Sequence, residues 1–510
     1  MKKRMIAVLS VLVLLFLPLS ACTPEVPIPT LSDCGAVEGM LMHTSTTKYT
    51  YSESDGIVST KNSLFLPAGS VIESEMNIAV YPYDQHNTLD KALLAESGQG
   101  LVGDYMVMMA PGAVTLTKDA YVRVAVHGTL EDVSITVPEE RRAEVMVFDT
   151  AYEAYQKDYD RILPLVEQAG KDAVNYIFIT DIHNDQNSNS AAQRASLKKQ
   201  VETAVKLANE SDSIDFIVVG GDNTSGHYPD KATTISYNHA VFAPLKECKK
   251  PVLMLMGNHD DNSYSAATQL YDETMAANLI SKVQWNKEHL QTYVPNTVVH
   301  DSKNADSAYY YYDLTAKKTR LVCLDAIDYV QETDENGVIR VDSLAQDADG
   351  NSLVGRNYWG YSARQLQWLA EEALTAVDGW NYVFFSHMNV QESYAYGTEL
   401  HDLLKAFNDR TVYSNDELGT LDFTAATGEI LIYQYGHVHV ERMTEDAAIG
   451  AWRVSTSSAN IALLSNNKKG TEGYRAFGTD SECCFDVMVV GKDVVKKYAF
   501  GAGKDAELTK

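Results

Sequence analysis

The fold of this chain is decided by the stretch Val252-Leu253-Met254-Leu255-Met256-Gly257-Asn258-His259-Asp260. Its first five residues are apolar and predict a short buried strand. The polar residues that follow can serve a metal site, because the amide oxygen of Asn258 is a possible ligand and His259 can present an imidazole beside a substrate. Taken alone, the stretch fits a polar turn after a buried strand equally well.

Four other apolar runs in the chain end in polar clusters of the same kind. Open α/β sheets gather their chemistry at the carboxyl ends of strands, so the five clusters are expected to meet there. The other four are residues 174–179 before Asp181-Ile182-His183, residues 214–219 before Gly220-Gly221-Asp222-Asn223, residues 382–385 before Ser386-His387, and residues 430–435 before Gly436-His437-Val438-His439.

The residue types and spacing in these clusters favour metal binding. Side chains two positions apart in an extended segment point to one side, which pairs Asp181 with His183 and His437 with His439. Carboxylates and imidazoles suit Zn, Mn or Fe better than Ca. Asp222 offers one carboxylate that could bridge two ions. The Asp181-Ile182-His183 pair alone is more simply explained by chance or by structure, and no other cluster is decisive by itself, but the five together predict a two-metal hydrolase.

The first residues predict export. A basic start, Met1-Lys2-Lys3-Arg4, precedes an apolar stretch too short to span a bilayer comfortably. Leu19-Ser20-Ala21-Cys22 resembles the lipobox of bacterial lipoproteins, in which the cysteine is acylated. We therefore expect a signal peptide over residues 1–21, a lipid anchor at Cys22 and a tether over residues 22–34. The protein would face outside the cytoplasm on the bacterial cell membrane. An ordinary cleaved signal with an incidental Cys22 is the alternative.

Two regions of different periodicity follow the tether. Residues 35–147 contain short β-like runs with turn signals, which predict a β-sandwich domain. Such exported domains often bind a surface polysaccharide, although a spacer or docking role is at least as good an interpretation. Residues 148–171 form a connector with helical character that Pro164 is expected to break.

Strands alternate with helices from residue 172 to residue 510, which predicts a layered α/β domain. Helices are expected at residues 190–209 and 361–376. The insertion 261–380 is longer than one crossover requires, so we expect it to build a cap or rim over the site. Within it, Trp359 and the run Tyr309-Tyr310-Tyr311-Tyr312 could line that rim, although alternate tyrosines in a strand more often belong to the core.

The chain is strongly acidic, with a net charge of −27 from 42 Lys and Arg against 69 Asp and Glu. An acidic surface repels a phosphate backbone, so no polynucleotide partner is expected. A small phosphorylated substrate drawn in by bound metal cations remains compatible with this charge.

The order and residue types of the five clusters resemble the calcineurin-like metallophosphoesterase family, over roughly residues 172–441. The resemblance implies a four-layer α/β/β/α sandwich after the smaller all-β domain. It implies two metal ions, of Mn, Fe, Zn or Co, that share a bridging hydroxide. The implied roles are Asp181, His183 and His439 on the first metal, Asn258, His387 and His437 on the second, Asp222 between them, and His259 as the acid that contacts the phosphoryl oxygen or protonates the leaving group.

One position departs from the family pattern. Many members have a carboxylate three residues after the bridging aspartate, where it supports the histidine of the third cluster. Here that position is Ser225. The resemblance then requires another group to orient His259, such as a different carboxylate.

These observations predict an exported metal-dependent hydrolase of phosphodiesters or phosphomonoesters. The nearest alternative is a nucleotidase or a nucleotide pyrophosphatase. An alternative of another class is a non-catalytic cell-surface binding protein that acts through its β domain. Degenerate clusters would favour that last alternative, but every ligand position is filled here.

Overall fold

The computed structural model describes residues 28–44, 49–83, 90–102, 106–148, 150–169, 173–184, 191–228, 230–264, 273–346, 352–375, 379–460 and 482–509. The predicted signal peptide and lipobox, with Cys22, lie outside these residues. Within the described ranges, no helix has both the length and the apolar composition needed to cross a membrane.

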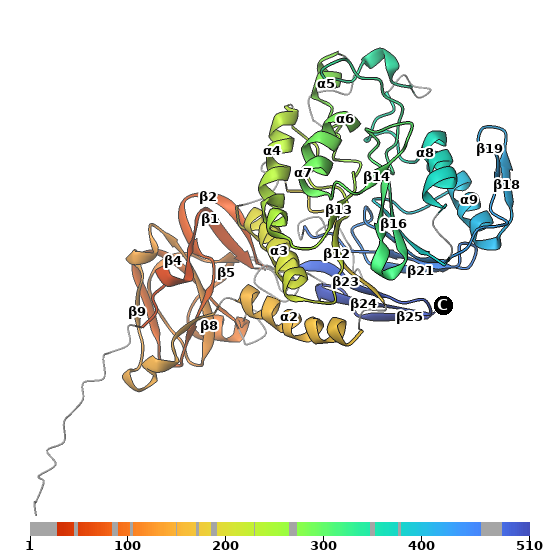
Figure 1. Cartoon of the computed structure of the whole chain (residues 1–510). Helices are drawn as coiled ribbons and strands as arrows, with labels where there is room; N and C mark the ends of the chain where they lie inside the picture. The colour runs from red at the N-terminus through yellow and green to blue at the C-terminus, as the bar shows by residue number, and fades with distance from the viewer. Residues whose placement is uncertain are drawn as a thin grey trace, which may run out of the picture.

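The N-terminal strands form one antiparallel sheet, and among the described residues they pair only with one another. The order is β1-β2-β8-β3-β10, while β4 pairs with β7, β8 and β9. A small separate pair, β5 and β6, and helix α1 complete this region, which Figure 1 draws in red and orange. The bounds are β1 (Ala36–Thr44), β2 (Tyr49–Thr60), β3 (Ser63–Leu66), β4 (Val71–Tyr83), α1 (Lys91–Glu96), β5 (Leu101–Val102), β6 (Met106–Val107), β7 (Ala110–Thr115), β8 (Ala120–His127), β9 (Ser134–Thr136) and β10 (Met146–Phe148).

Both faces of this sheet are covered by apolar side chains. Successive residues of a strand point to opposite faces. In β4, Ile78 and Val80 pack in one buried cluster, whereas Ala79 and Tyr81 pack in another. The strands agree with the predicted β-rich character of residues 35–147, while the sandwich arrangement and the domain boundaries stay predictions.

The second region contains a mixed sheet of order β13-β12-β11-β23-β24-β25. Strands β11, β12 and β13 are parallel, and β23 pairs antiparallel with β11. The strand β23, from near the C-terminus, therefore lies in the middle of the sheet. The bounds are β11 (Val174–Ile179), β12 (Phe216–Val219), β13 (Val252–Met254), β23 (Cys484–Val490), β24 (Val494–Gly501) and β25 (Ala506–Thr509).

A further sheet has the order β14-β15-β16-β17-β20-β22-β21. Its strands β16, β17, β20 and β22 run parallel. The bounds are β14 (Val299–His300), β15 (Tyr310–Leu314), β16 (Thr319–Leu324), β17 (Asn381–Ser386), β20 (Ile430–Tyr435), β21 (Arg442–Asp446) and β22 (Ala451–Ser455), with a separate pair β18 (Val412–Asn415) and β19 (Gly419–Asp422).

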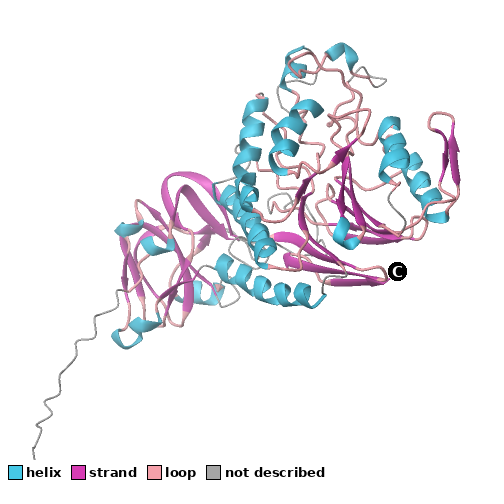
Figure 2. Ribbon diagram, in the orientation of Figure 1, coloured by secondary structure: helices cyan, strands magenta, loops and turns pink. Residues whose placement is uncertain are grey.

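The two mixed sheets share one apolar core. The ring of Tyr176 from β11 meets the ring of Phe385 from β17 edge to face, with centroids 5.1 Å apart. Helices lie beside both sheets (Figure 2). The mixed α/β fold that was predicted is thus observed. The helices are α2 (Thr150–Ala169), α3 (Ala191–Glu210), α4 (Lys231–Phe242), α5 (Glu273–Asn278), α6 (Lys282–Trp285), α7 (Gln291–Tyr293), α8 (Ala363–Trp368) and α9 (Gly397–Asp409).

Pro164 does not break the helix of the connector. Helix α2 continues through it to Ala169. Proline removes one main-chain hydrogen bond, at a cost of about 3 kcal/mol in a helix interior. Tyr159, Ile162 and Val166 are buried in the common core. Full burial of one apolar side chain stabilises the fold by roughly 1.5–3 kcal/mol, so this packing outweighs the cost of the proline.

The segment 261–380 is more than a cap. It contributes β14, β15 and β16, and β16 is an interior strand of the second mixed sheet. The helix expected at residues 361–376 is also shorter, because α8 ends at Trp368 and a single π-helical turn, Leu369–Ala373, follows it.

The tyrosine run belongs to the core. Tyr309 and Tyr310 are buried, and the Tyr310 hydroxyl donates to the main-chain oxygen of Met254 at 2.9 Å. Tyr311 and Tyr312 are partly buried against the same core. Trp359, in contrast, is 40% exposed.

His289 should make the free energy of unfolding depend on pH. Its imidazole is fully buried, and burial, with a smaller effect of His239, lowers its pKa to about 3. An unfolded histidine has a pKa near ~6.5. Between these values the unfolded chain binds a proton that the folded chain excludes, so stability falls as the pH drops below about 6.5, by about 1.4 kcal/mol per unit.

The test is urea unfolding of metal-free wild type and His289→Gln from pH 7.5 to pH 4.5. Below about pH 6.5 the free energy of unfolding should fall less steeply in the variant than in the wild type, by about 1.4 kcal/mol per pH unit. Equal slopes in the two proteins would contradict the assignment.

Candidate metal centre

The five clusters meet at one edge of the two mixed sheets. Asp181, after β11, donates its main-chain N–H to the oxygen of Gly221, after β12, at 3.0 Å. The N–H of His437, after β20, donates to the Asp181 carboxylate at 3.0 Å, which links the two sheets. The parallel strands therefore bring their carboxyl ends together as the sequence predicted.

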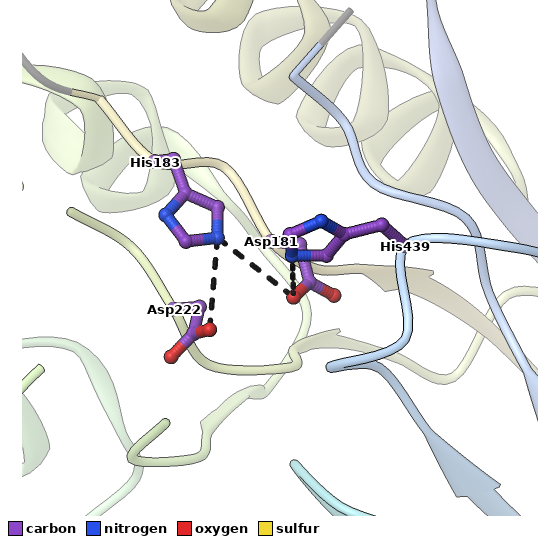
Figure 3. Close-up of side chains that lie close together, drawn as sticks. All are labelled: Asp181, His183, Asp222 and His439. Atoms are coloured by element: carbon purple, nitrogen blue, oxygen red, sulfur yellow. Dashed lines mark ion pairs between the residues drawn. The ribbon is translucent and has the colours of Figure 1, made fainter. Parts of the chain in front are cut away.

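Four side chains form what we call the first donor group: Asp181, His183, Asp222 and His439. One possible ligand atom of each lies within 4.8 Å of the others. His439 Nε2 is 3.2 Å from Asp181 Oδ1, and His183 Nε2 is 3.6 Å from Asp222 Oδ2. Figure 3 shows these side chains converging on one space.

Asp222 also belongs to a second donor group, with Asn258, His387 and His437. His387 Nε2 is 3.2 Å from Asp222 Oδ2 and 3.2 Å from Asn258 Oδ1. One ligand atom each of Asp222, His387 and His437 again lies within 4.8 Å of the others. The structure thus brings all seven predicted ligands together, with Asp222 shared between two groups.

Hydrogen bonds orient the donors of the second group. His387 Nδ1 lies 2.8 Å from the oxygen of Gly220, and an N–H placed there leaves the Nε2 lone pair facing the site. The Asn258 amide nitrogen donates to the Tyr264 hydroxyl at 3.1 Å, which turns the amide oxygen toward His387.

The backbone is strained at the candidate ligands. Nine residues other than glycine have positive φ among the described residues, and five of them are candidate ligands. This left-handed conformation is uncommon for such residues and persists only where the surroundings impose it, as at functional sites. The five are Asp181 (φ 53°), His183 (φ 43°), Asp222 (φ 53°), His437 (φ 65°) and His439 (φ 57°).

Two glycines allow the clusters to approach each other. A Cβ on Gly257 would lie 2.2 Å from the main-chain nitrogen of Asp222, and one on Gly221 would lie 2.7 Å from His387 Nδ1. Gly221 also has a φ of 94°, which glycine adopts without strain. The main chain at Gly221 therefore approaches His387 and Gly257 more closely than a side chain would allow.

Burial and charge oppose each other at the shared carboxylate. Burial raises the pKa of Asp222, but the charges of His387 and His259 outweigh it and hold the pKa well below its usual value. Burial lowers the pKa of His387, yet Asp222 raises it more, to about 9. The pKa of His437 shifts in the opposite direction, because burial and the charge of His387 lower it to about 4.

The donor set fits two divalent cations. Asp181 and Asp222 are at most 1% exposed, and burying two carboxylates this fully requires compensating positive charge. Imidazole nitrogens, carboxylates and one amide oxygen suit Mn, Fe, Zn or Co, and the shared Asp222 allows two adjacent positions. The number and identity of the ions stay predictions.

His259 lies at the border of the site, and a main-chain carbonyl holds it. Its Nδ1 is 2.7 Å from the oxygen of Ser225, while its Nε2 is 4.0 Å from Asp222 Oδ2. The Tyr264 ring stacks on the imidazole with centroids 3.8 Å apart. The group that orients His259 is thus a main-chain carbonyl and not the different carboxylate given as the example, and any residue at position 225 could supply it.

Asp260, the last residue of the third cluster, has a structural role that the sequence pattern does not indicate. Its buried carboxylate accepts from the N–H groups of Asp222, Asn223 and Gly257 at 2.8–2.9 Å, and from the Asn223 amide at 3.0 Å. Burial and the charge of Asp222 raise the pKa of Asp260 to about 7, against the effect of these donors. Tyr264 likewise lies outside every sequence motif.

Replacing His259 should lower the rate and leave the metals bound. A positioned general acid contributes typically about 10²–10⁴-fold, and we expect a loss in that range for His259→Ala. The loss should be larger for an alkyl phosphate than for p-nitrophenyl phosphate, because nitrophenolate leaves without a proton. Initial rates and metal analysis test this, with His401→Ala, at a histidine paired with Asp446, as the control. Equal losses on both substrates would exclude an acid role.

Two mixed sheets with a buried cluster of carboxylates and imidazoles at the strand ends define a metal-binding protein of mixed α/β fold. The family model described as Calcineurin-like phosphoesterase matches residues 174–441, more than half of the chain. The chain therefore belongs to this family of phosphoester hydrolases, which bind divalent metals.

Solved structures resemble the chain only distantly. A dimetal phosphatase from Danio rerio is 17% identical, covering 66% of this chain and 98% of its own, with a TM-score of 0.43. The purple acid phosphatase of yellow lupin is 10% identical, covering 93% of this chain and 74% of its own, with a TM-score of 0.35. No curated protein matches the chain. Such distant likenesses say nothing of the substrate.

Proposed function

We propose that this chain is an exported, lipid-anchored phosphoesterase that hydrolyses a small phosphate ester at a dinuclear metal site. The observation that supports it best is the pair of donor groups sharing Asp222. We further propose that the two mixed sheets and their helices form a four-layer α/β/β/α domain over residues 172–510, preceded by a separate β domain.

The residues of the site have separate roles. The first donor group (Asp181, His183, Asp222, His439) and the second (Asp222, Asn258, His387, His437) would each hold one cation. When bound, the cations supply positive charge to the phosphate oxygens and lower the pKa of a coordinated water. Asp222 fixes the spacing of the two positions. His259, held by Ser225 and Tyr264, presents its Nε2 to the oxygen of the leaving group.

A metal and turnover assay on the full chain tests the proposal. We expect about two transition-metal ions per chain. EDTA should abolish turnover of p-nitrophenyl phosphate or bis-p-nitrophenyl phosphate, and Mn²⁺ should restore it. The ratio of the two rates would assign a monoester or diester preference. A metal-free, inactive protein that binds a surface polysaccharide would favour the non-catalytic alternative. Detergent partitioning of the wild type and Cys22→Ser tests the anchor.

A further inference from the structure

The loop of residues 352–361, which we call the rim loop, is fixed against the third cluster. The N–H of Gly355 donates to Asp261 Oδ2 at 2.7 Å, and the N–H of Arg356 donates to Ser263 Oγ at 2.8 Å. Asp261 and Ser263 directly follow the Gly257–Asp260 cluster in the chain. The side chains that the rim loop presents therefore keep a set position relative to the metal centre.

Arg356 lies beside the site, and no carboxylate of the described residues pairs with it. Its guanidinium is 5.9 Å from the centre of the Tyr264 ring, the same ring that stacks on His259. Within the described ranges no Asp or Glu forms an ion pair with Arg356, although the chain carries a net charge of −27.

The other arginines of segment 261–380 differ from Arg356. Arg320, Arg340 and Arg364 each pair with an aspartate at 2.7–3.0 Å. An arginine that pairs with no described carboxylate in so acidic a protein is available to a bound anion. Its planar guanidinium matches the oxygens of a phosphate with two parallel hydrogen bonds.

Trp359 gives the same border a flat apolar surface. It is the aromatic residue among the exposed large hydrophobic side chains of the described chain, at 40% exposure. Its ring lies 5.1 Å from the ring of His437, centre to centre. His437 and Asn258 belong to the same donor group, and Tyr264 bonds to Asn258. Arg356 therefore lies near the second donor group on the side of Asn258, with Tyr264 between them. Trp359 lies next to His437, another member of the same group.

We propose that the substrate is a nucleoside diphosphate. Its terminal phosphoryl group binds at the two donor groups, its other phosphate pairs with Arg356, and its base packs on Trp359. An oxygen from water bonds to the terminal phosphorus while the bridging P–O bond breaks. The bridging oxygen leaves with the nucleoside monophosphate and takes a proton, and orthophosphate is the second product. This inference rests on the phosphoesterase function proposed above.

The test compares three substrates on the full chain loaded with Mn²⁺. The substrates are ADP, inorganic pyrophosphate and p-nitrophenyl phosphate, and wild type should have its highest kcat/KM with ADP. Arg356→Ala should raise KM for ADP and pyrophosphate about 10–100-fold, as expected for a lost charge-assisted hydrogen bond, with kcat changed less than about threefold. Its KM for p-nitrophenyl phosphate should stay within about twofold, because that substrate has no second phosphate.

Further variants separate the two contacts. Trp359→Phe should raise KM for ADP and leave that for pyrophosphate unchanged, since only ADP has a base. Arg340→Ala, at an exposed arginine paired with Asp342, is the matched control and should match wild type on all three substrates. Metal content should be the same in every variant.

The outcomes distinguish this inference from the proposed function. Two results would exclude a nucleoside diphosphate as the substrate and leave the phosphoesterase function standing. One is a wild type that hydrolyses p-nitrophenyl phosphate but does not prefer ADP. The other is an Arg356→Ala variant whose KM changes equally for all three substrates or for none. If the metal-loaded wild type hydrolyses no phosphate ester, the proposed function itself fails.

Discussion

Asp222→Ala should abolish metal binding and lower phosphoester turnover by at least about 10³-fold, which corresponds to about 4 kcal/mol in the activation barrier. The reason is that Asp222 belongs to both donor groups, so its loss weakens both cation positions at once. It also removes the acceptor of the His259 main-chain N–H, which lies 2.9 Å from Asp222 Oδ1.

The measurement is metal content by mass spectrometry together with initial rates in Mn²⁺. Asp222→Asn keeps the volume and the acceptor for His259 but removes the charge, so it should fold normally and still lose metal. Asp212→Ala, at an exposed aspartate of the same domain, is the control. Full activity in Asp222→Ala would exclude the proposed site. Circular dichroism separates loss of metal from loss of fold.

Asp260→Ala should destabilise the protein by at least about 3 kcal/mol and lose metal as well. Its carboxylate accepts four N–H groups in the interior, and each buried donor left without an acceptor costs about 1–3 kcal/mol. One of these donors is the N–H of Asp222 itself, so the shared ligand would lose its position.

Urea unfolding of the metal-free protein measures the change in the free energy of unfolding separately from any change in metal binding. Asp260→Asn should have an intermediate effect, because its amide oxygen can still accept three of the four donors while its NH₂ group opposes the N–H of Asn223. Asp342→Ala, at an exposed aspartate, should change stability by less than about 0.5 kcal/mol. A stable, metal-replete Asp260→Ala would show that solvent replaces the carboxylate.

The candidate ligands could be predicted from the sequence because each is part of a local pattern. Asp181 and His183 follow one strand directly, and the parallel order of the strands brings such clusters together. The support of His259 could not be predicted in the same way. It comes from the main-chain oxygen of Ser225, which has no sequence signature, and from Tyr264, which lies beyond the motif.

Errors in the fold prediction arose where tertiary packing outweighed local preference. Pro164 predicts a helix end, but Tyr159, Ile162 and Val166 on either side of it are buried in the core and the helix continues. Segment 261–380 was interpreted as a cap from its length alone. Its strand β16 pairs in parallel with β17, and such long-range pairing is not visible in a local pattern.

The hydrogen bond from the His437 N–H to the Asp181 carboxylate has a consequence for biosynthesis. It joins residues 256 positions apart in the chain, one in each mixed sheet. The two halves of the centre are therefore translated far apart in time, and neither donor group is complete until His437 and His439, which follow β20, have been synthesised. A nascent chain lacks both complete donor groups until then, so we expect metal loading to follow synthesis of nearly the whole protein.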